Sequence, residues 1–137
     1  MSLVLDSSIT LAWFFEDERS ERADGVMRQV ASKGAVVPSL WRLEIANAFQ
    51  SAVRRKRISA AFRDASFADL RSFPIAVDSE TDRHAWGATL ALADRSRLTL
   101  YDAAYLELAQ RLRLPLASLD QGLRAACRTL RVALKPA

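Results

Sequence analysis

The chain has 137 residues, of which 50% are apolar and 26% are charged, enough for one compact core and too few for two stable ones. This composition excludes a disordered or low-complexity chain. Four glycines, four prolines and one cysteine exclude collagen-like, disulfide-stapled and zinc-ribbon proteins. Since the sequence shows neither a leader pattern nor an apolar run of the roughly 20 residues that a membrane span needs, we expect one soluble, cytoplasmic domain over residues 1–137.

The net charge of +4 comes from 20 basic and 16 acidic residues, and 17 of the basic residues are arginine. Guanidinium groups bind phosphate and carboxylate oxygens through a planar fork of donors, so an arginine-rich surface suits a nucleic-acid backbone or an acidic protein. A codon bias towards arginine and alanine produces the same composition. Charge alone therefore does not identify a function.

In the first half of the chain, short apolar runs alternate with longer amphipathic segments. The expected elements, in chain order, are a strand at 3–5, a helix carrying 9–15, a helix over 18–33, a strand at 35–37, and helices over 39–55 and 59–71. Ser7 or Ser8, Ser39 and Ser59 are the expected helix caps, and Gly34 is expected to end the second helix. The helix over 39–55 is expected to bury one stripe, formed by Leu40, Leu43, Ala46, Phe49 and Val53.

The second half continues the alternation after Pro74. The expected elements are a strand at 75–77, a helix from Ser79 that carries Trp86, Leu90 and Ala93, a helix over 101–113, a strand at 116–119, a short helix to Cys127 and a strand at 132–134. Alternating strands and helices are typical of parallel pairing through right-handed crossovers, with helices on both faces of the sheet. We therefore predict a three-layer α/β/α domain with a parallel sheet of four or five strands, each continuously apolar.

Four acidic residues are expected at the edge of this sheet where the strands end. Asp6 and Asp120 each follow a predicted strand directly, Glu44 lies in the helix after the second strand, and Asp102 stands in the first turn of its helix. The working site of such sheets lies beyond the carboxyl ends of the strands. Asp78 also ends a strand, but the polar run after it favours a helix N-cap.

Carboxylates gathered at one place repel each other, and a bound cation relieves that repulsion. All-oxygen ligands favour a hard ion such as Mg²⁺ or Mn²⁺, which keeps several waters and also binds phosphate oxygens. A site of this kind activates water and stabilises charge on a phosphodiester. The pattern therefore predicts metal-assisted phosphodiester hydrolysis.

Four segments, taken in order, carry a resemblance to a known family: LVLDSSITLAWFFEDE, WRLEIANAF, LTLYDAAYLELAQRL and LASLD. They resemble the acidic motifs of the PIN-domain ribonucleases, and within that superfamily the chain looks like the VapC toxins of VapBC toxin–antitoxin pairs. The resemblance runs from Val4 to about Cys127. It implies a PIN-like fold, an Mg²⁺- or Mn²⁺-dependent endoribonuclease acting on RNA, a VapB-like antitoxin partner and a homodimer.

The resemblance also implies roles for individual residues. The four acids correspond to the PIN catalytic acids, with Asp6 and Asp102 as direct metal ligands, Asp120 assisting, and Glu44 acting through water or a second ion. Three polar residues are expected to support them: Ser8, Asn47 and Ser118. Ser8 is expected to bind a metal-bound water or phosphate, and Ser118 to have a lesser role in hydrogen bonding. Asn47 lies one turn after Glu44 and is expected to orient it or the substrate, unless it is an ordinary surface residue.

A basic segment formed by Arg54, Arg55, Lys56 and Arg57 has two readings. It complements the C-terminus of its helix, or it contacts the RNA backbone. The sole histidine, His84, lies far from the motifs in sequence, and Cys127 has no histidine partner, so neither is expected to act in catalysis.

Two other classes of function remain open at this stage. A non-catalytic PIN-like domain that binds RNA or protein keeps the fold but usually loses acids that are present here. A receiver or haloacid-dehalogenase-type phosphotransfer domain needs a second acid beside Asp6, where Ser7 and Ser8 stand. A receiver also needs a lysine near a later strand, and no lysine lies between Lys56 and Lys135, so both types fit the sequence poorly. Nucleotide-binding glycine motifs are absent.

Overall fold

The computed structural model describes all residues, 1–137. Its centre is one five-stranded sheet in the order β3-β2-β1-β4-β5, in which every neighbouring pair is parallel. The strands are β1 Val4–Leu5, β2 Ala35–Val37, β3 Ile75–Val77, β4 Leu116–Ala117 and β5 Leu134–Lys135. Parallel pairing places the carboxyl ends of all five strands at one edge of the sheet.

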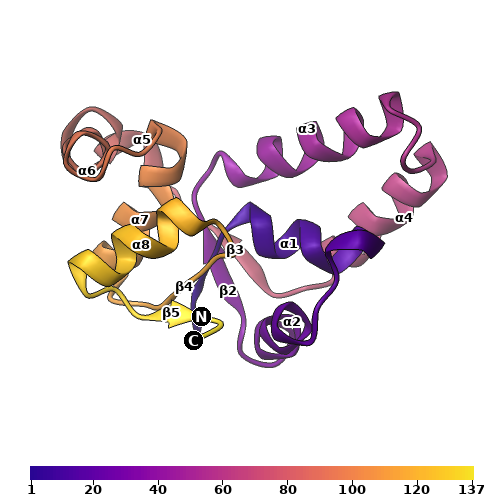
Figure 1. Ribbon diagram of the computed structural model, residues 1–137, viewed down its shortest axis with the longest axis horizontal. Helices are drawn as coiled ribbons and strands as arrows, with labels where there is room; N and C mark the ends of the chain where they lie inside the picture. Colours follow the sequence, from indigo (N-terminus) through magenta and orange to yellow (C-terminus); the bar gives the residue numbers. More distant parts are fainter.

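The helices form two layers around the sheet, which Figure 1 shows with α1 to α4 on one side and α5 to α8 on the other. The predicted three-layer α/β/α fold is confirmed. The helical segments are α1 Ser7–Phe14, η1 Glu16–Glu18, α2 Glu21–Lys33, α3 Trp41–Arg54, α4 Ala60–Arg71, α5 Thr81–His84, η2 Ala85–Thr89, α6 Leu90–Ser96, α7 Leu100–Leu112 and α8 Gln121–Leu130. None of them has the length and apolar character to cross a bilayer.

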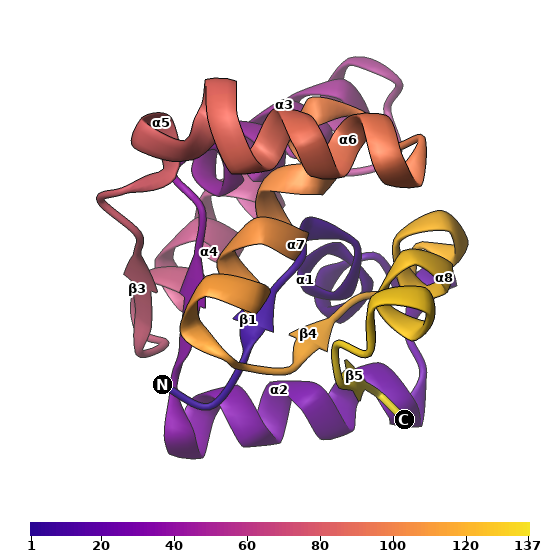
Figure 2. The ribbon, with the colours of Figure 1, turned by 90° about the vertical axis from the view of Figure 1, so that its left-hand side faces the viewer.

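Strand β1 lies at the centre of the core. Val4 pairs with Val36 of β2 on one side and with Leu116 of β4 on the other, and Leu3, Val4 and Leu5 are fully buried. Helix α7 packs across β1 and β4 (Figure 2). A strand covered on both faces by helices must be apolar throughout, which is why this run of three aliphatic residues predicted it correctly.

Strand β3 is less buried than the sequence predicted, since Ala76 and Val77 are exposed. It forms an edge of the sheet, so only β2 pairs with it.

The stripe predicted for α3 is only partly correct: Phe49 is fully buried and Leu40 packs against the core, but the rest of the buried face differs. Leu43 is 76% exposed, and the buried face consists of Trp41, Ile45, Phe49 and Ala52. Both series have helical spacing, so periodicity alone did not separate them.

The predicted helix from Ser79 to about 93 is interrupted. The chain forms α5, η2 and α6 in succession, with a sharp bend at Gly87 (φ −112°, ψ −106°). Trp86 beside the bend is 92% exposed and not in the core. The predicted helix over 18–33 is present as α2 but begins later, at Glu21, because Ser20 caps it by accepting a hydrogen bond from the Ala23 amide.

The predicted caps divide into two groups. Ser59 caps α4, and Gly34 ends α2 with a φ of 76°. By contrast, Asp6 and Leu40 occupy the N-cap positions of α1 and α3 without capping through their side chains. Glu80 takes the N-cap position of α5. The predicted N-caps that the structure does not form are therefore Ser7, Ser8, Ser39, Ser79 and Asp78.

Helix α7 ends at Arg113 in the left-handed region, with a φ of 57°. That conformation costs an L-residue about 1–2 kcal/mol. Replacing Arg113 by glycine removes this cost, but glycine loses more conformational entropy on folding, which offsets part of the gain in stability. Arg113→Gly should therefore raise the free energy of unfolding by about 0.5–1 kcal/mol, measured by urea denaturation. Gln110→Gly, at an exposed position inside the same helix, is the control and should lower it by about 1 kcal/mol. A loss of stability in Arg113→Gly would contradict the assignment.

Candidate active site

The four acids predicted at the sheet edge come from four elements. Asp6 follows β1 directly, and Asp120 lies three residues after β4. Glu44 and Asp102 stand in the first turns of α3 and α7. Thr99 caps α7 through a hydrogen bond from the Asp102 amide at 3.1 Å, which fixes the backbone of that acid. The fold thus places the acids around the carboxyl ends of β1 and β4.

Asp6 is the most enclosed of the four, at 3% exposed. Its carboxylate accepts hydrogen bonds from three hydroxyls: Ser118 Oγ at 2.7 Å, Ser8 Oγ at 2.8 Å and Ser7 Oγ at 3.3 Å. Hydrogen bonds to a buried carboxylate compensate for lost hydration and hold it in one orientation. Ser8 and Ser118, both singled out in the sequence, thus donate to the Asp6 carboxylate, and Ser7 joins them.

The same serines connect Asp6 to the segment that carries Asp120. Ser8 Oγ accepts a hydrogen bond from the Leu119 amide at 2.9 Å, and Ser118 Oγ accepts one from the Asp120 amide at 3.0 Å. The Asp120 carboxylate itself caps α8 by accepting from the Leu123 amide at 2.8 Å. The backbone at the ends of β1 and β4 is therefore held by side-chain hydroxyls as well as by strand pairing.

Glu44 is held from α7, by a hydrogen bond in which the Tyr105 hydroxyl donates to Glu44 Oε1. Tyr105 is fully buried. Asn47 is exposed, and Glu44 takes its hydrogen bond from Tyr105 and not from Asn47. The role predicted for Asn47 in orienting Glu44 is thus filled by Tyr105, a residue on another helix.

The carboxylates lie close enough to affect one another's ionisation. Burial raises the pKa of Asp6 above its usual value against the opposing hydrogen bonds of Ser118 and Ser8, and the charge of Asp120 raises it further. Burial and the charges of Asp6 and Asp120 raise the pKa of Asp102. Burial also raises the pKa of Glu44, to which Asp6 and Asp102 add. Holding these like charges together therefore costs the folded state free energy.

The donor set is made of carboxylate and hydroxyl oxygens, which suits a hard divalent cation. No three acidic, histidine or cysteine side chains are already gathered as a complete ligand set for one ion, and two of these carboxylates are engaged by Tyr105 and the Leu123 amide. Mg²⁺ commonly binds through one or two carboxylates and keeps its remaining waters, so a complete protein cage is not required. The residues therefore fit such an ion.

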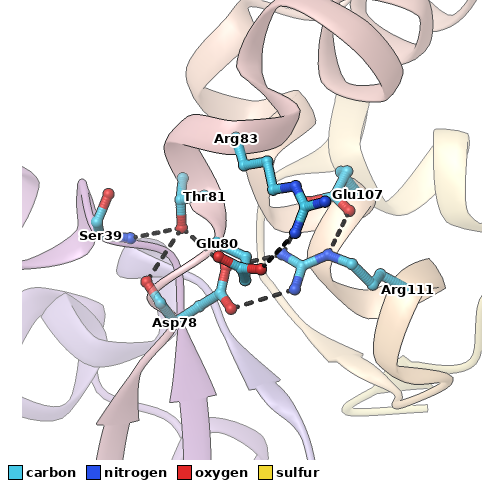
Figure 3. A network of polar contacts seen from close by, with 7 residues as sticks. All are labelled: Ser39, Asp78, Glu80, Thr81, Arg83, Glu107 and Arg111. Atoms are coloured by element: carbon cyan, nitrogen blue, oxygen red, sulfur yellow. Dashed lines mark hydrogen bonds and ion pairs between the residues drawn. The ribbon is translucent and has the colours of Figure 1, made fainter.

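A second polar network ties α7 to the carboxyl end of β3 (Figure 3). Arg111 donates hydrogen bonds to Asp78 at 2.7 and 3.1 Å and to Glu107 at 2.7 and 3.0 Å. Thr81 Oγ1 lies 3.0 Å from the Asp78 carboxylate and accepts from the Ser39 amide at 3.0 Å. Burial alone would raise the pKa of Asp78, but the hydrogen bonds from Arg111 and Thr81 lower it overall. The network thus fixes α7, which carries Asp102, and the turn that leads to α3.

The basic segment lies at the opposite end of α3 from Glu44. Arg54 is ten residues beyond that acid, roughly 15 Å along a helix. Figure 1 shows that end of α3 far from the sheet. All four residues are exposed, and Arg57 pairs with Asp17 at 3.0 Å and lies 4.9 Å from the centre of the Phe15 ring. The structure thus does not bring this segment to the acids.

Comparison with known proteins decides the family. The model of the PIN domain matches residues 3–128, a range that contains all four acids and the three serines around Asp6.

The chain belongs to the PIN-domain family.

Within this family, the chain is similar to ribonuclease VapC3 of Pyrobaculum aerophilum, with 29% identity over 123 residues that cover 90% of this chain and 92% of the relative. The resemblance to VapC proteins is thereby confirmed. A crystal structure from Pyrobaculum aerophilum has the same fold, with a TM-score of 0.69, 24% identity and coverage of 92% and 86% of the two chains. A toxin–antitoxin complex from Klebsiella pneumoniae gives a TM-score of 0.59 at 18% identity and 87% coverage of each chain.

The crowding of carboxylates in this PIN domain leads to a prediction on stability. Because the folded state raises the pKa of Asp102, ionisation at neutral pH destabilises the fold relative to the unfolded chain. Asp102→Asn should raise the midpoint of thermal unfolding in EDTA by a few degrees, since a half-exposed repulsion is worth on the order of 1 kcal/mol or less. Asp94→Asn, at an exposed position on α6, should leave the midpoint unchanged. A lower midpoint for Asp102→Asn would show that the acids do not repel one another in the folded state.

Proposed function

We propose that this PIN domain is an Mg²⁺- or Mn²⁺-dependent endoribonuclease and the toxin of a toxin–antitoxin pair. The observation that carries the proposal is the group of four acids at one sheet edge, in which burial and mutual charge raise the pKa values of Asp6, Glu44 and Asp102. The similarity to ribonuclease VapC3 supports RNA as the substrate. Strained carboxylate clusters of this kind are typical of functional sites, since the fold gains nothing from them.

Asp6, Asp102 and Asp120 are the residues that would hold the ion, with Glu44 close by. When bound, the ion would lower the pKa of a coordinated water and stabilise the charge that develops on the scissile phosphate. Ser7, Ser8 and Ser118 orient Asp6 by donating hydrogen bonds to its carboxylate.

Glu44 is the residue best suited to accept a proton from the attacking water. Tyr105 occupies Oε1, so Oε2 is the oxygen for this transfer, and a raised pKa brings the carboxylate nearer to the value at which a base works efficiently. The water oxygen forms the new bond to phosphorus as the bond to the leaving ribose oxygen breaks, and that oxygen takes a proton from solvent water to leave as a hydroxyl group. The chain needs no covalent intermediate for this hydrolysis.

A VapB-like antitoxin is the partner that the family implies. A groove beside α1 offers one place for it, lined among others by Phe14, Phe15, Met27, Ile58 and Phe62 with Arg19 and Arg57 nearby. Such an apolar groove with a charged rim suits an amphipathic segment.

We further propose that two copies associate in the cytoplasm through exposed apolar side chains of α3, η2, α6 and α7. These elements expose Leu43, Trp86, Leu90, Leu100 and Tyr101, and large exposed apolar surfaces often mark protein interfaces.

The catalytic proposal predicts the effect of single neutral substitutions. Asp6→Asn and Asp102→Asn should each slow RNA cleavage by about 100-fold or more, because each removes a charge that acts in the transition state. Cleavage of a fluorescent RNA by purified protein gives the rates, and inhibition of growth on induced expression gives a second readout. EDTA should stop the wild type, and Mg²⁺ or Mn²⁺ should restore it.

Asp94→Asn again serves as the control and should cleave like the wild type. Activity that persists in EDTA would point to a metal-free nuclease. A wild type that binds RNA but never cleaves it with either ion would instead favour the non-catalytic PIN-like alternative.

The basic segment makes a separate prediction for RNA binding. Replacing Arg54, Arg55 and Lys56 by glutamine should weaken binding if they contact phosphates, and it should reduce the slope of log affinity against log salt by about 0.7 per lost contact. Arg57 is left intact because it pairs with Asp17. Lys33→Gln with Arg95→Gln, both exposed on other helices, is the control. An unchanged slope would assign the segment to capping the end of α3.

A further inference from the structure

Arg124 of α8 is a buried arginine without an acidic partner. It is 6% exposed, and the ion pairs of the chain do not include it. Instead, its Nη1 donates to two backbone carbonyls, Ser118 O at 3.0 Å and Pro136 O at 2.9 Å. Burying a guanidinium group is costly, and hydrogen bonds to two neutral carbonyls compensate for it less well than a carboxylate would.

The first of these carbonyls belongs to the serine that orients Asp6. Ser118 has each of its polar groups engaged. Its amide donates to Lys135 O at 3.0 Å, its carbonyl accepts from Arg124, and its hydroxyl donates to Asp6 and accepts from the Asp120 amide. Any change in the backbone of Ser118 therefore displaces the hydroxyl that holds the most buried acid of the site.

The second carbonyl belongs to the segment after β5. This strand is only two residues long and lies at the edge of the sheet, paired with β4 through Ala117 and Lys135. Figure 2 shows it beside β4 near the end of the chain. The segment lies outside the range of the family match, which ends at residue 128. Arg124 thus joins a segment outside the shared PIN region to a serine inside the site.

We propose that Arg124 is a positioning residue, which ties the segment 134–136 to Ser118 and thereby sets the orientation of the Asp6 carboxylate. The path consists of four hydrogen-bonded groups: Pro136 O, the Arg124 guanidinium, Ser118 and Asp6. On this view β5 is part of the support of the active site and not merely the last strand of the sheet. The proposal rests on the ribonuclease function proposed above.

The kinetic test is a double-mutant cycle between Arg124 and Ser118. Arg124→Met should lower kcat for RNA cleavage by about 10- to 100-fold, the usual effect of losing a group that orients a metal ligand, with KM little changed. Ser118→Ala should cause a similar loss. Because both act through one hydroxyl, Arg124→Met added to Ser118→Ala should reduce kcat less than threefold further. Additive effects of the two substitutions would overturn the proposal.

Arg128→Met is the matched control, since Arg128 lies one turn further along α8 and is exposed. It should cleave RNA like the wild type. If Arg124→Met fails to fold, Arg124→Gln replaces it in the cycle, because it keeps a polar donor on a shorter side chain that cannot bridge the two carbonyls.

A second measurement does not depend on cleavage. Amide hydrogen exchange at Ser118 and Asp120 reports the bonds to Lys135 O and to Ser118 Oγ. Arg124→Met should speed exchange at both amides by at least tenfold relative to Ala103 in the interior of α7, whereas Arg128→Met should not. Unchanged exchange in Arg124→Met would overturn the positioning role even if the protein cleaves RNA. Faster exchange in Arg124→Met, together with a wild type that cleaves no RNA, would instead contradict the proposed function alone.

Discussion

The structure depends on one electrostatic constraint: four carboxylates must be held near one another at the carboxyl edge of a parallel sheet. Burial and mutual repulsion both oppose this arrangement, as the raised pKa values of Asp6, Glu44 and Asp102 show. The opposing force comes from the apolar core beneath. Strand β1 is buried on both faces, and α7 packs across it and β4. The hydrophobic burial that holds these elements together fixes where their acidic ends must meet.

Neutral hydroxyl donors make the arrangement tolerable. Hydroxyls of Ser7, Ser8 and Ser118 surround Asp6, and the Tyr105 hydroxyl holds Glu44. Ser118 and Tyr105 lie far in sequence from the acids that they hold, so their hydrogen bonds also fix the position of one element against another. The site is therefore pre-organised by the contacts that join its layers, and loosening a remote contact displaces a reactive group.

The sequence predicted the three-layer fold and the edge of the sheet on which the acids stand. Apolar runs such as 3–5 mark buried strands, and an acid directly after such a run is placed by parallel pairing alone. What the sequence did not predict depends on side chains from distant segments. The bond of Tyr105 to Glu44, the link of Arg124 to Ser118 and the register of α3 follow from how helices rotate and pack. Periodicity allowed two stripes on α3, and packing buried the one with Ile45. The bend at Gly87 likewise has no marker except the glycine itself.

The pairing of Arg111 with Asp78 has a consequence for the charge balance of the molecule. Asp78 ends β3 at the same edge as the other acids, two strands away from β1, or roughly 10 Å at the usual strand spacing. An unpaired anion there would lie within the Debye length of the others and add to the field that they produce. The guanidinium group neutralises this fifth acid where it stands. A helix that carries one member of the group thus also carries the counter-charge that keeps another acid from joining it.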